Sequence, residues 1–299
     1  MPFLTRASGF AEARPGGDGV GARLLRRWTA KASLGVLLLV LAAAIVPAWL
    51  APGDPFEQDL SLRLVGPVWT ERGVPKRLLG SDHLGRDLLS RMIFAARVTM
   101  LVAVLAVLGA TLAGVAAGLA SGYFGGWVDT LLMRLADVQL AFPVILLVVV
   151  VVAVVGPSVT NLIVILAVSG WPRIARIARG SVLSVREQDY VNGARAAGSG
   201  DLKIMLKHIL PNVASPIIVY ASFEVARMIL LEATMSFLGL GVQPPTPTWG
   251  GMINDGRGYL HISLTASLLP GIAIAATILA CNLLGDDLRD ALDPGLGQE

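Results

Sequence analysis

Few residues in this chain have the types and spacing that chemistry requires. The three histidines, His83, His208 and His261, lie far apart, and Cys281 is the single cysteine, so neither a metal site nor an internal disulfide is predicted. The sequence contains no HExxH motif, no GxSxG motif and no GxxxxGK[ST] phosphate-binding loop. We therefore expect no catalytic residues and no nucleotide site in this chain.

The remaining candidates are charges within long apolar runs. A charge at the centre of a membrane helix costs roughly 2.5–3.5 kcal/mol, so such charges lie near an interface, form pairs or mark a transport path. Arg134 and Asp137 are spaced for an ion pair on one helix face, which we favour over a substrate contact, and Glu224 and Arg227 have the same spacing. Glu232 has no ionic partner at helical spacing, so it should face protein or a water-filled path. A hydrogen bond to a neighbouring helix and a place in a pore wall are both open for it.

The elements that carry these charges are apolar helices. The chain has 299 residues, of which 55% are hydrophobic and 15% charged, with a mean hydropathy of +0.69. A soluble domain carries about 25% charged residues. Long apolar runs, most of them free of charge, predict an all-α membrane protein with six transmembrane helices. The runs are residues 32–51, 98–121, 131–155, 159–172, 213–240 and 262–284.

Six spans place both termini on one side of the membrane. Basic residues cluster in the first 31 residues and again between residues 173 and 207, so the positive-inside rule makes that side cytoplasmic. We divide the chain into a cytoplasmic tail (1–31), a first transmembrane helix (32–51), an extracytoplasmic loop (52–92), a core of five transmembrane helices (93–285) with a cytoplasmic loop at 173–211, and a second cytoplasmic tail (286–299).

Small residues and prolines refine this picture. Gly109, Gly114 and Gly118 lie in the second span, where small residues allow close helix packing, and we favour packing within the subunit over contact with a second one. Pro143 lies inside the third span and is expected to be tolerated there. The fourth span is expected to end at Pro172.

The polar stretch from Asp189 to Asn212 predicts two short helices. The first has small residues at helical spacing, at Val191, Ala194 and Ala197, so one face can sit deep in a groove of a partner. Gly198 begins a glycine-rich break.

The second short helix should begin after Asp201, a good N-cap residue, and end at Pro211. Its apolar face is predicted to consist of Leu202, Met205, Leu206 and Ile209. From the residues alone, a basic amphipathic helix lying on the anionic membrane surface is as acceptable as a docking loop.

This stretch resembles the EAA loop of ABC-importer permeases, the helix pair that docks on an ATP-hydrolysing subunit. The residues that fall at the family's spacing are Asn192, Gly193, Ala194, Gly198, His208, Ile209, Leu210 and Pro211. Asn192 replaces the usual Glu, Gly193 the usual Ala and His208 the usual Ile, while the glycine and the Leu-Pro match. Residues 80–97, 236–253 and 282–294 are similar to segments of the dipeptide/oligopeptide/nickel subgroup, and the combined pattern resembles its C-type permease.

The resemblance implies a function, partners and a location. It implies the type I ABC-importer permease fold in the bacterial cytoplasmic (inner) membrane, and ATP-driven import, with di- or oligopeptides as the expected substrate. The implied partners are a homologous permease in a heterodimer, two ATPase subunits and an extracytoplasmic substrate-binding protein. The ATPases would bind ATP and Mg, so no cofactor is expected in this chain, and no nucleic acid is expected as a partner. The ATPase-coupling residues would be Asp189, Tyr190, Asn192, Gly193, Ala194, Ala197, Gly198, Asp201, Leu210 and Pro211.

Two other classes of membrane protein are considered as alternatives to an importer permease. A self-sufficient channel or secondary transporter is the alternative, but no convincing repeat is present and such a protein does not need the 189–212 loop. A membrane enzyme lacks its motifs. The stiff proline-rich segment Gln243–Trp249 and the loop at 52–91 are candidate docking sites for a binding protein, or plain connectors.

Overall fold

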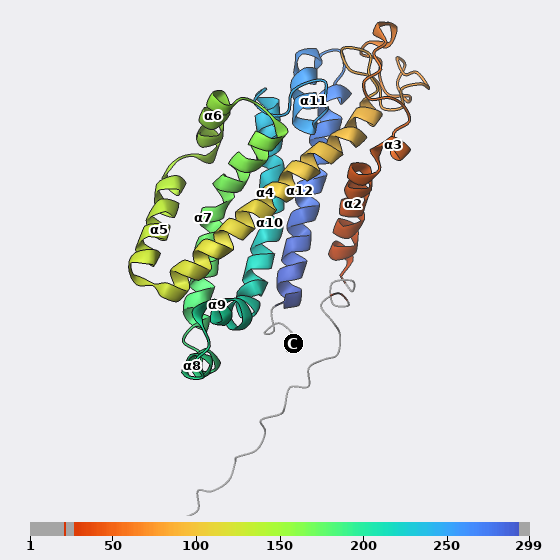
Figure 1. Cartoon of the computed structure of the whole chain (residues 1–299). Helices are drawn as coiled ribbons and strands as arrows, with labels where there is room; N and C mark the ends of the chain where they lie inside the picture. The colour runs from red at the N-terminus through yellow and green to blue at the C-terminus, as the bar shows by residue number, and fades with distance from the viewer. Residues whose placement is uncertain (1–20, 22–26, 293–299) are drawn as a thin grey trace, which may run out of the picture.

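The longest described helix, α4 (Leu88–Phe124), runs obliquely across the molecule and contacts most of the others (Figure 1). The structure is a computed structural model that describes residue 21 and residues 27–292. Most of the predicted N-terminal tail and the last part of the C-terminal tail, residues 1–20, 22–26 and 293–299, lie outside the described residues.

The described chain is helical. The elements after α4 are α5 (Gly126–Ala141), α6 (Val144–Val155), α7 (Val159–Val185), α8 (Asp189–Ala196), α9 (Asp201–Lys203), η2 (Ile204–Ile209), α10 (Leu210–Phe237), α11 (Trp249–Gly256), η3 (Arg257–Tyr259) and α12 (Thr265–Leu292). Before α4 come α2 (Trp28–Ile45), α3 (Pro47–Leu50) and η1 (Leu60–Leu62). We call the two ends of the bundle the α8 end and the α11 end, and Figure 1 shows them at opposite extremes.

Five described helical segments are long and apolar enough to cross a membrane. They are Trp28–Ile45, Leu88–Phe124, Val159–Val185, Asp201–Phe237 and Thr265–Leu292. The pair α5 and α6 qualifies together as a sixth, but it is bent by 89°. The predicted number of spans is therefore reached only if this bent pair counts as one.

Pro143 is expected to be tolerated inside the third span, but the helix is broken there, so the span is bent and not continuous. Phe142, which precedes the proline, is extended at φ −93° and ψ 138°. Proline disfavours the helical conformation for the residue before it, so the helix stops at Ala141 and restarts at Val144.

The fourth helix continues through Pro172 to Val185, so the predicted end at Pro172 is also wrong. The reason is packing against α4. A Cβ added at Gly114 would lie 2.7 Å from the Cβ of Ile174, and one added at Gly118 would lie 2.5 Å from the Cβ of Ala178. These glycines let α4 and α7 approach closely along residues beyond the proline, which confirms packing within the subunit.

Pro211 does not end a helix either. The residues Ile204–Ile209 form a π turn, and α10 follows it directly with Pro211 in its first turn, where a missing amide hydrogen costs little. The π turn also changes which residues are buried. Ile204 and Ile209 are buried, whereas Leu202 is 65% and Leu206 is 51% exposed, so half of the predicted apolar face is wrong.

Two apolar clusters form the core. One lies among α4, α7, α10, α11 and α12 toward the α11 end, and includes Leu88, Leu166, Met228 and Met235. The other lies toward the α8 end, where Ile174, Val191, Ile204, Ile209 and Val213 pack together. The second cluster places the short helices α8 and α9 on the ends of α4, α7 and α10.

Hydrogen bonds join the start of α2 to the end of α12. Arg27 donates to Asp287 at 3.0 Å and to Asp290 at 2.5 Å, and Thr29 donates to Asp287 at 2.9 Å. The hydrogen bonds to Asp290 and Asp287 raise the pKa of Arg27. The helix α2 begins at Trp28, ahead of the predicted start at residue 32, and α12 continues past the predicted boundary at residue 285 to Leu292.

Candidate functional site

The α8–α9 loop protrudes from one end of the bundle (Figure 1). Val191 is the buried residue of α8, and Ala194 packs beside it on the internal cluster, so the small face predicted to enter a partner is turned inward except at Ala197. Gly198 adopts φ +77° directly after α8. There the amide of Ser199 donates to the carbonyl of Ala194 at 3.1 Å, and the amide of Gly198 donates to that of Arg195 at 3.0 Å. This pair of bonds is the glycine-terminated helix end known as a Schellman motif, which fixes the angle between α8 and α9.

Most of the predicted coupling residues in this loop are exposed to solvent. Asp189, Tyr190, Asn192, Gly193, Ala197, Gly198, Asp201 and Pro211 are exposed, and Ala194 and Leu210 are partly buried. The loop therefore combines a firm internal anchor with a free outer surface, as docking on a partner requires.

Tyr123 ties this loop to the end of α4. Its hydroxyl donates to the carboxylate of Asp201 at 2.7 Å, and the guanidinium of Arg195 lies 5.8 Å from the centre of its ring. Gly200, and not Asp201, is the N-cap of α9, and no side chain caps that helix. The predicted capping role of Asp201 is therefore wrong, because its carboxylate is directed to Tyr123 instead.

Two arginines, Arg179 on α7 and Arg186 at the C-cap of α7, tie together the ends of α4, α5 and α7 next to the loop. Arg179 makes two hydrogen bonds to Asp129 of α5, at 2.5 and 2.6 Å, and Ser121 of α4 donates to the same carboxylate at 2.5 Å. Arg186 donates to the carbonyl of Gly122 at 2.7 Å. Sequence reasoning counted these arginines only as positive charge. Their spacing by about two turns on α7 was a signal that both lie on one helix face.

The predicted pair of Arg134 and Asp137 is not formed. Asp137 pairs instead with Arg176 of α7, and Arg134 is exposed without an ion-pair partner among residues 27–292. A neighbouring helix supplies the counter-charge, since α5 lies against α7.

The charges of α10 behave as their spacing indicates. Arg227 pairs with both carboxylate oxygens of Glu224, which is buried. Glu232 is fully buried and accepts hydrogen bonds from Thr99 of α4 at 2.9 Å and from Ser236 at 2.7 Å. Glu232 therefore faces protein, which is one of the two environments left open for it, and links α10 to α4.

Comparison with known proteins identifies the family to which this chain belongs. The profile of the family described as "Binding-protein-dependent transport system inner membrane component" matches residues 110–298. This chain belongs to that family. A second profile, for the N-terminal transmembrane domain of oligopeptide transport permease C, matches residues 19–67, which include α2. The chain is thus a transport component of a bacterial inner membrane and not an enzyme, as predicted.

Individual relatives agree with this family membership. The chain is 42% identical over 269 residues to the di/tripeptide transport system permease protein DppC of Pseudomonas aeruginosa, covering 89% of each chain. It is 40% identical to the dipeptide transport system permease protein DppC of Haemophilus influenzae, covering 88% of this chain and 89% of the other. It is 41% identical to the glutathione transport system permease protein GsiD of Escherichia coli, covering 91% and 88%.

A solved structure shares the fold. The MetNI methionine ABC transporter, in inward-facing conformations, contains a chain that matches with a TM-score of 0.55 and 17% identity, covering 68% of this chain and 97% of that one. The predicted permease fold is therefore confirmed.

Proposed function

We propose that this chain is the permease subunit of an ATP-driven importer of short peptides. The observation that carries the coupling role is the α8–α9 loop, which is exposed outside, anchored inside and continuous with α10. The substrate class rests on the relatives, whose names specify dipeptides, di- and tripeptides and glutathione.

The α8 end is assigned to the cytoplasm and the α11 end to the outside. Support comes from the basic residues at the α8 end, which the positive-inside rule places on the cytoplasmic side. They are Arg173, Arg176, Arg179, Arg186, Arg195, Lys203 and Lys207. The boundaries of the tails, the outer loop and the core follow from this assignment.

The partners follow from the same proposal. A homologous permease forms the other half of the translocation path in a heterodimer, and two ATPase subunits bind ATP and Mg. A substrate-binding protein delivers peptide at the α11 end. The exposed residues of the α8–α9 loop contact an ATPase subunit, with Tyr190 and the small exposed residues Gly193 and Ala197 entering its groove.

The mechanism is a switch between two states of the permease pair. Closure of the ATPases moves α8 and α9. Tyr123 passes that motion to α4, and the Arg179–Asp129 pair links α7 and α5 at the same end. Because α10 is continuous with α9 through the π turn, it moves with the loop. The path then changes from inward-facing to outward-facing, as alternating access requires.

The test is purification from the native membrane in mild detergent, followed by reconstitution. We expect a second permease and one or two ATPases to copurify. Proteoliposomes given the binding protein should accumulate labelled Ala-Ala only when ATP is enclosed, and vesicles without ATP are the control. Recovery of this chain alone, or accumulation without ATP, would instead support the channel or secondary-transporter alternative.

A further inference from the structure

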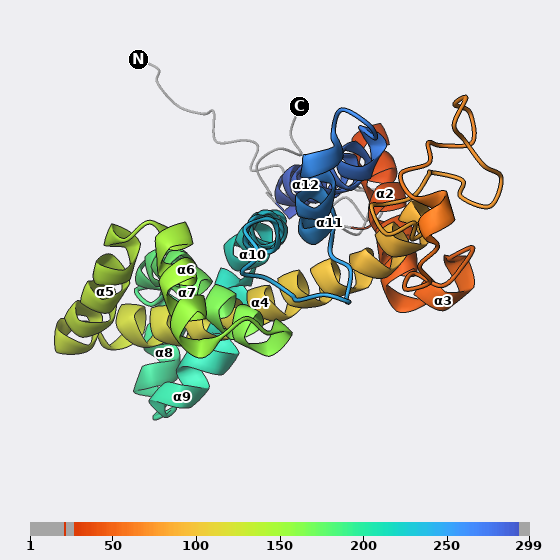
Figure 2. The same ribbon diagram turned by 90° about the horizontal axis from the view of Figure 1, so that it is seen from above.

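A cavity of about 300 Å³ opens at the α11 end. Its walls are the start of α4, the residues just before it, α11 and the proline-rich segment that follows α10. Figure 2 shows this segment crossing α4 on its way to α11. The volume is at the lower limit of pockets that hold small molecules.

Two buried arginines line this cavity. Arg86 is 6% and Arg91 is 4% exposed. The Nε of Arg86 donates to the Oδ2 of Asp82 at 2.6 Å, and the Oδ1 of Asp82 accepts from the backbone amides of Leu84 and Arg86. The same Oδ2 of Asp82 also lies 3.4 Å from the Nε of Arg91, so Asp82 forms an ion pair with both guanidinium groups but a hydrogen bond only with Arg86.

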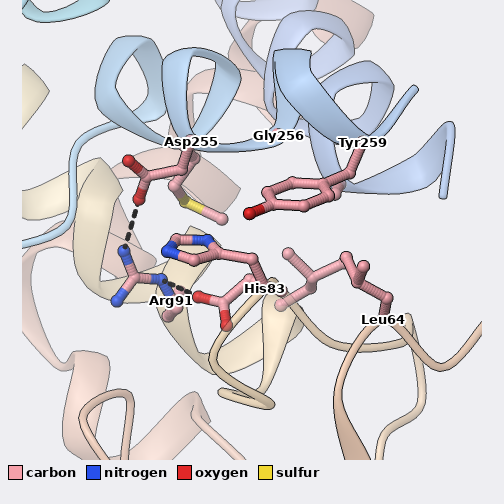
Figure 3. A pocket seen from close by; sticks show the side chains of 10 residues that line it. Leu64, His83, Arg91, Asp255, Gly256 and Tyr259 are labelled. Carbon is pink, nitrogen blue, oxygen red and sulfur yellow. Dashed lines mark ion pairs between the residues drawn. The ribbon is translucent and has the colours of Figure 1, made fainter. Parts of the chain in front are cut away.

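The second acidic residue does not satisfy them. The Oδ2 of Asp255 lies 3.6 Å from the Nη2 of Arg86 and 3.7 Å from the Nη2 of Arg91, both beyond hydrogen-bond length. Figure 3 marks both ion pairs of Arg91, one with Asp255 and one with Asp82. The Nε and Nη1 atoms of Arg91 are buried and have no hydrogen-bond partner within residues 27–292. Buried donors of a charged group without acceptors are rare, and a carboxylate is the acceptor that suits them.

A negative charge lies at the rim of this cavity, next to the positive charges of the two arginines. The side chain of Asp255 is 32% exposed, and Gln243 and Asn254 line the wall beside it. Arginine pairs suit a carboxylate, because their planar N–H groups match its two oxygens. The arginines would bind a carboxylate inside the cavity, and Asp255 would bind an ammonium group at the rim. A short zwitterion carries both of these groups.

We propose that this cavity binds a short zwitterionic peptide, with its carboxylate on Arg86 and Arg91 and its amino group near Asp255. The substrate class rests on the proposed function. An acidic side chain of a docked protein is the competing occupant. The enclosed position of both arginines, behind the segment from Pro244 to Thr248, favours the small ligand.

The test is equilibrium binding of radiolabelled Ala-Ala to the permease–ATPase complex in nanodiscs, without the binding protein. We expect saturable binding that weakens about tenfold or more for Ala-Ala amide, because the lost charged hydrogen bonds are each worth that much. Arg91→Lys should weaken Ala-Ala binding to a similar extent, since lysine lacks the planar fork. Arg72→Lys is the matched control, because Arg72 is exposed on the same outer loop and does not line the cavity.

A second variant keeps the test valid if Arg91→Lys does not fold. The wild-type complex should prefer Ala-Ala over N-acetyl-Ala-Ala, and Asp255→Asn should abolish that preference while leaving both arginines in place. Equal binding of both peptides to the wild type would overturn the assigned orientation.

The outcomes separate this inference from the proposed function. ATP-driven uptake without saturable binding, or equal binding of Ala-Ala amide, would overturn the inference alone. Binding without ATP-driven uptake would overturn the proposed function alone. If Arg91→Lys weakened only the affinity of the binding protein for the complex, the cavity would take an acidic side chain and the peptide site would be refuted.

Discussion

Gly198 offers a direct test of how the α8–α9 loop is held. Its φ of +77° lies in the left-handed region, and an added Cβ would meet nothing within 4 Å. Any cost of a substitution is therefore backbone strain and not a clash. For an ordinary L-residue that strain is about 1–2 kcal/mol, and it is larger for a β-branched residue. A bias of this size changes the population of the native loop conformation by a factor of roughly 5–30.

The substitutions form an ordered series. Gly198→Asn should be nearly neutral, because asparagine visits the left-handed region, whereas Gly198→Ala and then Gly198→Val should be increasingly harmful. Gly200 is the matched control. It also has open space around its Cβ position, but its φ of −67° suits any residue. Gly200→Ala should therefore leave the loop intact.

The assay is peptide uptake per ATP hydrolysed in proteoliposomes that contain the whole importer. We expect Gly198→Val to lower this ratio about fivefold or more, at the low end of the range set by the strain, while the protein still inserts and assembles. An unchanged ratio in Gly198→Val would refute the coupling role of the loop geometry. Equal damage from Gly200→Ala would refute the backbone argument.

Three further predictions concern the helices around this loop. Glu232→Gln should assemble and transport nearly normally, because Glu232 is hydrogen-bonded inside the protein; lost uptake in a fully assembled complex would restore its interpretation as pore lining. Gly118→Leu should lower the thermal midpoint and the yield of complex in detergent, since overpacking costs about 1–3 kcal/mol; Gly180→Leu, where a Cβ meets nothing within 4 Å, should not, and equal loss in both would contradict the packing argument. Tyr123→Phe removes one exposed hydrogen bond to Asp201, so uptake per ATP should fall less than in the valine variant above, and a larger fall would show that Tyr123 does more than anchor.

Local patterns in the sequence predicted the membrane class, the apolar runs and the position of the α8–α9 loop. These features depend on composition and on spacing within one segment. The pair of Glu224 and Arg227 was predictable for the same reason, since both residues lie on one turn of one helix. The buried position of Glu232 followed from the cost of an unpaired charge in lipid.

Features that depend on neighbouring helices could not be predicted this way. Pro172 ends a helix only if nothing outweighs its local effect, and here α4 packs along the residues beyond it. The partner of Asp137 is 39 residues away in the chain, and no local spacing identifies it. The π turn before Pro211 shifts the buried face by one residue, which a pattern based on an ordinary helical period cannot show.

The uninterrupted helix from Asp201 to Phe237 makes the two ends of the molecule mechanically dependent. At 1.5 Å per residue this helix is roughly 55 Å long, so it acts as a lever arm. The π turn lies near one end of it. One tip carries the surface proposed to meet an ATPase, and the other reaches Ser236 in the wall of the arginine-lined cavity. Thermodynamic reciprocity then requires that occupancy of the cavity changes the affinity for the ATPase by the same factor by which the ATPase changes the affinity of the cavity.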